Sequence, residues 1–159
     1  MKPILSLITA LLICSVSFAQ SIEAKLWSIA KQKYPTDAEM QRYIYNEQKK
    51  AYNYITRVAD AEIKRFAEKK YPDDYSMQVY VYDEQKTAKF NMAKVTDAAL
   101  KAFAIKKYPD DFSMQKYIYD EQAAAKDFMQ SIPDNAAKKK AQKEYPDDFS
   151  MQKYIYENQ

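Results

Sequence analysis

Carboxylate, amide and phenol side chains recur in this sequence at one fixed spacing. The first set consists of Asp37, Gln41, Tyr45 and Gln48, whose members are 4, 4 and 3 residues apart. At about 100° per residue, this spacing places all four side chains along one side of a helix. Tyr offers contact area at low entropic cost and Gln offers hydrogen bonds, so the set has the chemistry of a peptide- or glycan-binding surface.

The set occurs four times because the chain is built from repeats. The tyrosine that precedes proline recurs every 37 residues without insertion, at Tyr34, Tyr71, Tyr108 and Tyr145. A fixed period of this length indicates a tandem-repeat protein. Eight positions are identical in all four copies, which in the first copy are Tyr34, Pro35, Asp37, Met40, Gln41, Tyr43, Tyr45 and Gln48.

Two interpretations of this side of the helix compete. In the first it is an exposed row that binds a partner, and the candidate binding residues are Gln41, Tyr45, Gln48, Gln78, Tyr82, Gln85, Gln115, Tyr119, Gln122, Gln152 and Tyr156. In the second it is buried between repeats, and the amides bond to one another or to the preceding turn. We favour the second, because helices of stacked repeats are buried on more than one side. Tyr43 and its equivalents, on the other side of the core, are interpreted as packing residues.

Each repeat is predicted to be a pair of helices. In the first half, Leu26, Ile29 and Ala30 have the i, i+3, i+4 spacing of one buried face. Tyr-Pro then ends this helix, because the residue before proline avoids the α region. The second helix follows at once, with N-caps expected at Thr36, Asp73, Asp110 and Asp147. A calcium site at the Asp pairs is not expected, because the other oxygen ligands and the glycine of a calcium loop are missing.

The second helix of each repeat carries an apolar stripe that we interpret as core. In the first three copies the stripe consists of Met40, Ile44, Ala51 and Ile55, then Met77, Val81, Ala88 and Met92, then Met114, Ile118, Ala125 and Met129. This helix either continues into the next repeat, for about 34 residues, or breaks at the junction, as Pro133 indicates for the last one.

These patterns predict an all-α fold of tandem helical pairs, a short α-solenoid or elongated helical array. One repeat domain covers residues 20–159, in units of about 21–57, 58–94, 95–131 and 132–159.

Composition argues against an enzyme. The 159 residues include no His and no Gly, so the usual general base and the loops that cradle phosphates are both missing. We therefore expect no catalytic residue, no cofactor and no metal. The net charge of +3 gives no electrostatic case for nucleic acid. A non-catalytic binding or scaffolding module is the favoured function. The alternatives are a holdase-type periplasmic chaperone and, less favoured, an enzyme that cleaves cell-wall glycan with paired carboxylates.

The first 19 residues read as a secretory signal peptide. Lys2 is followed by an apolar run over residues 4–16 and by a small-x-small cleavage site that ends at Ala19. The run is too short for a membrane span, and Cys14 follows Ile13, where lipoprotein signals carry a small residue. We expect a periplasmic or secreted protein that is not a lipoprotein, is not stably inserted in the membrane, and meets a protein, peptide or glycan of the cell envelope.

The repeated phrase also carries a resemblance. Tyr-Pro-Asp-Asp-(Phe/Tyr)-Ser-Met-Gln-x-Tyr, found from Tyr71, Tyr108 and Tyr145, resembles a short helical motif of uncharacterised exported bacterial proteins. The Ser-Phe-Ala-Gln cleavage region is similar to signal peptides of the Bacteroidetes. The resemblance covers nearly all of the chain after the signal peptide, and it implies no activity.

The fourth repeat ends at Gln159, before the segment that supplies Ala51 and Ile55 in the first repeat. Its last helix carries Met151, Tyr154, Ile155 and Tyr156. We expect these groups to pack inward, with self-association through this unit as the alternative.

The cleavage site yields the first testable prediction. Mass spectrometry of the exported protein is expected to find Gln20 at the N-terminus, either free or cyclised. A mass that corresponds to a diacylated Cys14 would contradict both the cleavage site and the absence of a lipid anchor.

Overall fold

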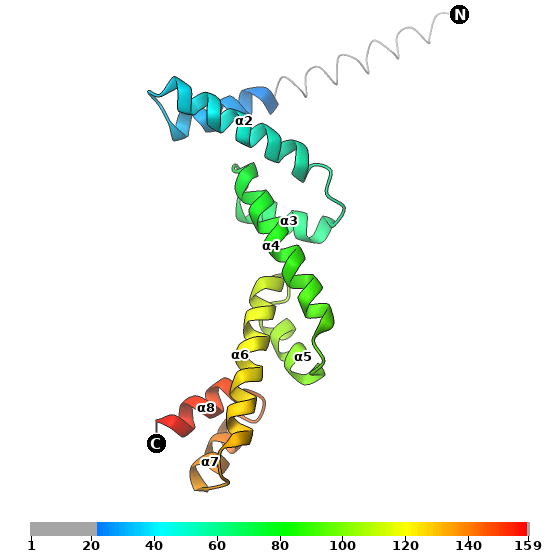
Figure 1. The fold of residues 1–159 in the computed structure, drawn as a ribbon, viewed down its shortest axis with the longest axis vertical. Coiled ribbons are helices and arrows are strands. Elements are labelled where there is room, and N and C mark those ends of the chain that lie inside the picture. The colour runs from blue at the N-terminus through cyan, green and yellow to red at the C-terminus, as the bar shows by residue number, and fades with distance from the viewer. Residues whose placement is uncertain (1–21, 159) are drawn as a thin grey trace, which may run out of the picture. The chain divides into compact units, whose positions relative to one another are not determined.

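The computed structural model describes residues 22–158, and every regular element in this range is a helix. A helix over residues 22–33 comes first. It is followed by α2 (Ala38–Ile55), α3 (Ala61–Lys70), α4 (Tyr75–Lys94), α5 (Ala98–Lys107), α6 (Phe112–Ser131), α7 (Ala136–Glu144) and α8 (Phe149–Glu157), as Figure 1 shows. Each repeat contributes two successive helices joined by a four-residue turn. The predicted all-α array of helical pairs is confirmed.

The chain consists of two compact units, each with its own internal contacts. The boundary between them along the chain falls within α4, between Val81 and Tyr82. The first unit holds the helix over residues 22–33, α2, α3 and the start of α4. The second holds the rest of α4 and α5 to α8, and in it α6 packs against both α5 and α8, while α8 packs against α7. The predicted signal peptide, its cleavage site and Gln159 lie outside the described residues.

The turn inside each repeat is made without glycine. Tyr108 ends α5 with φ −137° and ψ 75°, outside the helical region, as its position before Pro109 requires. Its N–H still donates to the carbonyl of Ala104 at 3.0 Å, and its own carbonyl accepts from the N–H of Asp111 at 3.4 Å. No residue in the described range has a positive φ, so every turn uses conformations open to ordinary residues.

The second aspartate of each pair, not the first, caps the second helix. Asp111 has an extended backbone, and its Oδ1 accepts from the N–H of Met114 at 3.1 Å. The equivalent bonds are made by Asp37, Asp74 and Asp148. The predicted caps Thr36, Asp73, Asp110 and Asp147 are therefore wrong by one residue. The reason is that the β-turn closed by the N–H of Asp111 uses the first aspartate, so the helix starts one residue later.

The core follows the predicted faces closely. The centre of each first helix is an alanine that is fully buried, at Ala30, Ala67, Ala104 and Ala141. In the second unit, Ala104 packs with Met92 and Ile118, and Phe103 and Tyr119 close around them. The predicted stripe is buried at its isoleucine, valine and later methionine positions. The first methionine of each stripe lies at its edge and is half-buried.

The helices of neighbouring repeats are separate. Breaks of three to five residues follow Ile55, Lys94 and Ser131, so the continuous-helix alternative is wrong at all three junctions. Side-chain caps start the next helix in each case. For example, Asp97 accepts from the N–H of Leu100 at 3.1 Å, and an N-cap carboxylate of this kind favours a fresh helix start. None of the helices in the described range is both long and apolar enough to cross a membrane.

Two methionines on α6 test which face is core. Met129 is buried and Met114 half-buried. Met129→Ala is therefore expected to lower the free energy of unfolding by about 2–5 kcal/mol. Met114→Ala removes less buried area and should cost clearly less. Urea melts of the two variants provide the measurement, and a larger loss for Met114→Ala would show that the packed face is assigned incorrectly.

Candidate functional site

The last invariant amide of each repeat connects that repeat to the next. Gln48, near the middle of α2, donates from Nε2 to Oδ1 of Asp74 at 2.7 Å. Its Oε1 accepts from the N–H of Tyr75, also at 2.7 Å. One buried amide thus bonds to both the N-cap carboxylate and the first backbone N–H of the following second helix. We call this arrangement the junction bridge.

The same bridge occurs at the other two junctions. Gln85 donates to Asp111 at 2.6 Å and accepts from the N–H of Phe112 at 2.7 Å. Gln122 donates to Asp148 at 2.7 Å and accepts from the N–H of Phe149 at 2.7 Å. All three bridging glutamines have only 1 or 2 % of their surface exposed. Because a buried amide without partners costs free energy, the Gln and its Asp depend on each other.

The other invariant amide stabilises the turn of its own repeat. Gln115 donates from Nε2 to the carbonyl of Tyr108 at 2.7 Å, and Gln41, Gln78 and Gln152 make the same bond to their own tyrosines. The carbonyls near the end of a helix have no intrahelical partner. The amide supplies that partner where the Tyr-Pro turn begins.

The invariant tyrosine between these amides packs against the first helix of its own repeat in the first and third copies, and against α6 of the preceding repeat in the fourth. Tyr45 stacks on Trp27 with ring centroids 4.4 Å apart, and its hydroxyl donates to Glu23. The hydroxyl of Tyr119 accepts from the N–H of Asp97 at 3.3 Å. Tyr82 is buried, and Tyr156 meets Phe128 edge to face.

Of the predicted binding residues, Tyr82 and every described glutamine except Gln41 are buried, and Gln41, Tyr45, Tyr119 and Tyr156 are half-buried. The first amide of each repeat bonds to the preceding turn, as the buried interpretation describes, whereas Gln48, Gln85 and Gln122 bond to the turn of the following repeat.

One invariant tyrosine per repeat remains exposed, contrary to its interpretation as a packing residue. Tyr43, Tyr80, Tyr117 and Tyr154 have 57, 62, 61 and 58 % of their surface exposed. We call them the exposed tyrosine series. Each precedes an apolar residue of the core stripe, which is buried in the first three repeats and half-buried in the fourth, and one position turns the tyrosine about 100° away from it. The sequence does contain a signal for this exposure. The residues one helical turn after each tyrosine are polar or acidic in every copy, as expected for the solvent-facing side of a helix.

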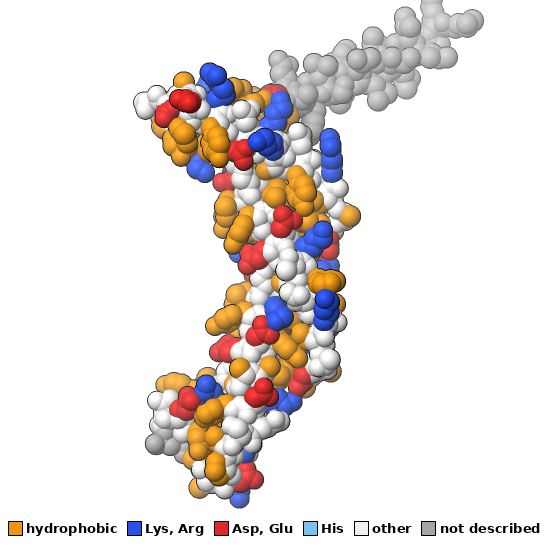
Figure 2. Space-filling model, in the orientation of Figure 1, with side chains coloured by type: hydrophobic (Ala, Val, Ile, Leu, Met, Phe, Trp, Pro, Cys, Tyr) orange, Lys and Arg blue, Asp and Glu red, His pale blue; other side chains and the backbone are white. Residues whose placement is uncertain are grey.

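Acidic groups therefore lie beside the exposed rings. On α6, Tyr117 is followed one turn later by Asp120 and Glu121, and Asp120 pairs with Lys116. On α2, Tyr43 is followed by Glu47, which pairs with Lys50 at 2.9 Å. In the space-filling view, hydrophobic side chains alternate with acidic and basic ones (Figure 2). An aromatic face with nearby carboxylates can hold a sugar ring with its hydroxyls, or a peptide with a cationic side chain.

A second polar contact lies beside Tyr119, the half-buried tyrosine of the third repeat. Lys126 Nζ is 2.6 Å from Oδ2 of Asp97. The hydrogen bond from Lys126, with the backbone bonds that Asp97 accepts as N-cap, lowers the pKa of this carboxyl below its usual value. In the part of the chain that the structure describes, no group of three or more Asp, Glu or Cys side chains is arranged to hold a metal ion.

Comparison with known proteins identifies no family for this chain. No protein-family model matches the sequence, and no curated protein or solved structure matches it.

The adjacent aspartates of the third repeat provide a matched test of the junction bridge. Asp111→Ala removes a helix cap and also leaves the buried amide of Gln85 without its acceptor. We expect a loss of roughly 2–4 kcal/mol in the free energy of unfolding. Asp110 is exposed, so Asp110→Ala should change stability by no more than about 0.5 kcal/mol. Urea melts that show equal losses for the two variants would contradict both the cap assignment and the bridge.

Proposed function

We propose that this protein is an exported, non-catalytic binding or scaffolding module. Its partner would be a protein, peptide or glycan of the cell envelope, held by the exposed tyrosine series. One observation carries the proposal: each repeat presents an identical tyrosine with more than half of its surface exposed. The invariant glutamines of the second helix bond to groups in the turns and junctions, so the stability of the fold explains why they are the same in every repeat. The exposed tyrosine makes no such contact with the core, so its repetition needs another explanation.

The chemistry of the exposed ring supports binding. A tyrosine side chain has few rotatable bonds, so it loses little entropy when a partner covers it. Its ring contributes apolar contact area and its hydroxyl contributes a hydrogen bond, which is why tyrosine is enriched at interfaces. The carboxylates one turn later, such as Glu121 after Tyr117, add hydrogen-bond acceptors on the same side of the helix.

Repetition on one chain strengthens such binding. A single exposed tyrosine contributes little affinity, but linked weak sites act together when the partner also repeats. A polymeric glycan or a protein with several equivalent segments has this property. A second copy of the chain is a further candidate partner, because Tyr154 in the last helix is as exposed as its equivalents.

The roles of the aspartates support a non-catalytic protein. The second carboxylate of each pair accepts backbone hydrogen bonds as an N-cap, and from the second repeat onward it also accepts the bridging amide. Such bonds hold the carboxylate in a fixed position and engage its Oδ1 as a hydrogen-bond acceptor. A glycan-cleaving pair needs one carboxyl group that is free to give its proton to the glycosidic oxygen.

A fourfold variant tests the proposal. The chain from residue 20 and a version with Tyr43, Tyr80, Tyr117 and Tyr154 changed to Ala are used as bait in envelope extract and mixed with purified wall glycan. Because these side chains are exposed, the variant is expected to keep its helical signal and most of its stability, but to lose the partner. Phe90→Ala is the control, because Phe90 is an aromatic residue that is 61 % exposed and lies outside the series.

Three outcomes would contradict the proposal. A partner that binds the fourfold variant as well as the original chain would show that the exposed tyrosines are not the site. Capture of a broad set of unfolded proteins would favour the holdase-type chaperone instead. Turnover of the wall glycan would favour the enzyme.

A further inference from the structure

The turn before the second helix is covered in the later repeats and exposed in the first. In the second, third and fourth repeats, the N-cap aspartate and the two residues after it are half-buried, at 74–76, 111–113 and 148–150. The equivalent residues of the first repeat, 37–39, are all exposed. The invariant glutamine one turn later follows the same trend, because Gln41 is half-buried and its equivalents are buried. Among the four turns within residues 22–158, the first is therefore the one left open to solvent.

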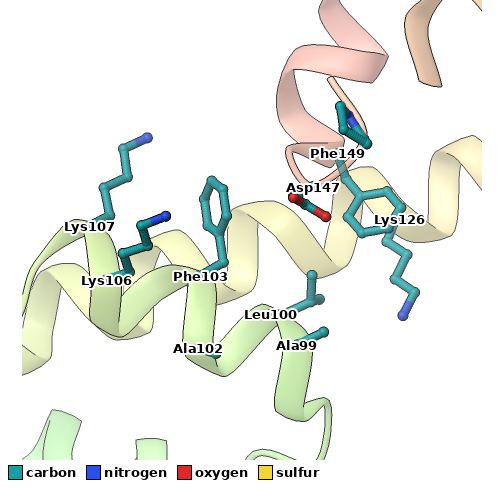
Figure 3. A pocket seen from close by; sticks show the side chains of 10 residues that line it. Ala99, Leu100, Ala102, Phe103, Lys106, Lys107, Lys126, Asp147 and Phe149 are labelled. Atoms are coloured by element: carbon teal, nitrogen blue, oxygen red, sulfur yellow. The ribbon is translucent and has the colours of Figure 1, made fainter. Parts of the chain in front are cut away.

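An aromatic ring directly after the N-cap contacts the preceding second helix at every junction. Tyr75 meets Tyr52 of α2 edge to face, with ring centroids 5.2 Å apart. The equivalent contacts of the second unit are Lys89 Nζ 4.8 Å from the ring centroid of Phe112, and Lys126 Nζ 5.6 Å from that of Phe149 (Figure 3). The ring therefore forms part of the surface on which the preceding helix lies, beside the junction bridge.

The next position holds a small serine at every junction. The N–H of Ser113 donates to Oε1 of Gln85 at 3.3 Å. The hydroxyl oxygens of Ser113 and Ser150 are buried, and they have no hydrogen-bond partner among the described residues. The small side chain thus leaves room for the preceding helix and its amide. A carboxylate at this position would lose its hydration when that helix docks, which costs free energy unless a partner replaces the water.

The first repeat has different residues at both positions. Ala38 stands where the later repeats have Tyr or Phe, and Glu39 stands where they have Ser. Ala38 offers a methyl group in place of a ring, and an approaching helix would have to desolvate the carboxylate of Glu39. The same three residues, Asp-Ala-Glu, begin α3 at residues 60–62, where the alanine and the glutamate are also exposed. The first turn thus has the residues of a solvated helix start in place of those of a junction.

The sequence contains one more bridging position than there are turns that accept an amide. Gln159 stands 37 residues after Gln122, at the position of the bridging glutamines. In the part of the chain that the structure describes, the accepting turns are those at Asp74, Asp111 and Asp148. The last helix of one copy therefore carries an amide that an open first turn of another copy would accept. Head-to-tail contacts of this kind produce rings or open filaments.

We propose that the first Tyr-Pro turn is an end cap. Ala38 and Glu39 prevent the second helix of another repeat, in particular the last helix of a second copy of this chain, from docking on the turn and bridging to Asp37. The cap keeps copies from joining head to tail, although each copy carries both the amide and the carboxylate of a bridge. This inference does not rest on the proposed binding function, since neither residue belongs to the exposed tyrosine series.

One substitution in the fourth repeat tests the effect of the glutamate. Ser150→Glu places at the third junction the group that Glu39 places on the first turn. Amide hydrogen exchange in α8 is expected to become about tenfold faster or more, because the charge must be desolvated for α8 to stay packed on α6. Ser150→Ala is the matched control and should leave the exchange rates unchanged, since the hydroxyl bonds to no described group. Equal exchange in the two variants would overturn the proposal.

Removal of the cap is tested in a chain whose last helix is complete. In α6 the helix continues from Gln122 to Ser131, and Ala125 and Met129 in this segment are buried. A copy of residues 123–131 is therefore added after Gln159 of the chain from residue 20, which gives the capped chain. The uncapped chain also carries Ala38→Phe and Glu39→Ser. In analytical ultracentrifugation, the uncapped chain is expected to self-associate about tenfold or more tightly than the capped chain, because its first turn can accept the amide.

Two further variants show whether the association is head to tail. Ala61→Phe with Glu62→Ser, made in the capped chain, changes the same tripeptide at the start of α3 and should not promote association. Gln159→Ala in the uncapped chain removes the amide and should return the association to that of the capped chain. Circular dichroism checks that each variant keeps its helices. Equal association of the capped and uncapped chains would contradict the end cap, and so would association that is promoted equally at α3 or is unaffected by Gln159→Ala.

Discussion

The rest of the structure depends on a buried amide that bonds across the junction between two repeats. In the bridge of Gln85, the amide donates to the carboxylate of Asp111 and accepts from the N–H of Phe112. That carboxylate also caps α6 through the N–H of Met114. Removing any member leaves another polar group buried without a partner, which costs more than the bond itself contributes. The bridge therefore couples the start of one second helix to the middle of the preceding one.

The bridge also explains why the period admits no insertion. Its amide and carboxylate are 26 residues apart at each junction, and the segment between them holds a helix break, a complete first helix and the Tyr-Pro turn. An extra residue in that segment would turn the first helix by about 100° relative to its neighbours. The alanine at its centre would then no longer face the core. The turn itself is held by the second amide, as when Gln115 bonds to the carbonyl of Tyr108. Both glutamines and the aspartate are therefore constrained together.

Periodicity was sufficient to predict the helical pairs, the Tyr-Pro stop and the buried faces, because apolar spacing gives the angle of each residue around its helix. It was not sufficient for the exposed tyrosine series. Tyr43 and Tyr45 lie about 100° on either side of Ile44, and only the position of the neighbouring helix decides which is covered. The cap at Asp111 was missed for a similar reason. Asp110 has the same side chain, and the choice between them depends on where the turn closes.

Each repeat carries both halves of a junction, a carboxylate at its turn and an amide farther along its second helix. The bridge can thus form between any copy and the copy that follows it, because its residues are the same at every junction. Duplication or deletion of a whole 37-residue repeat during recombination would still pair an amide with a carboxylate at every remaining junction. Evolution can in this way alter the length of the protein, and the number of tyrosines that it displays, without having to invent a new interface.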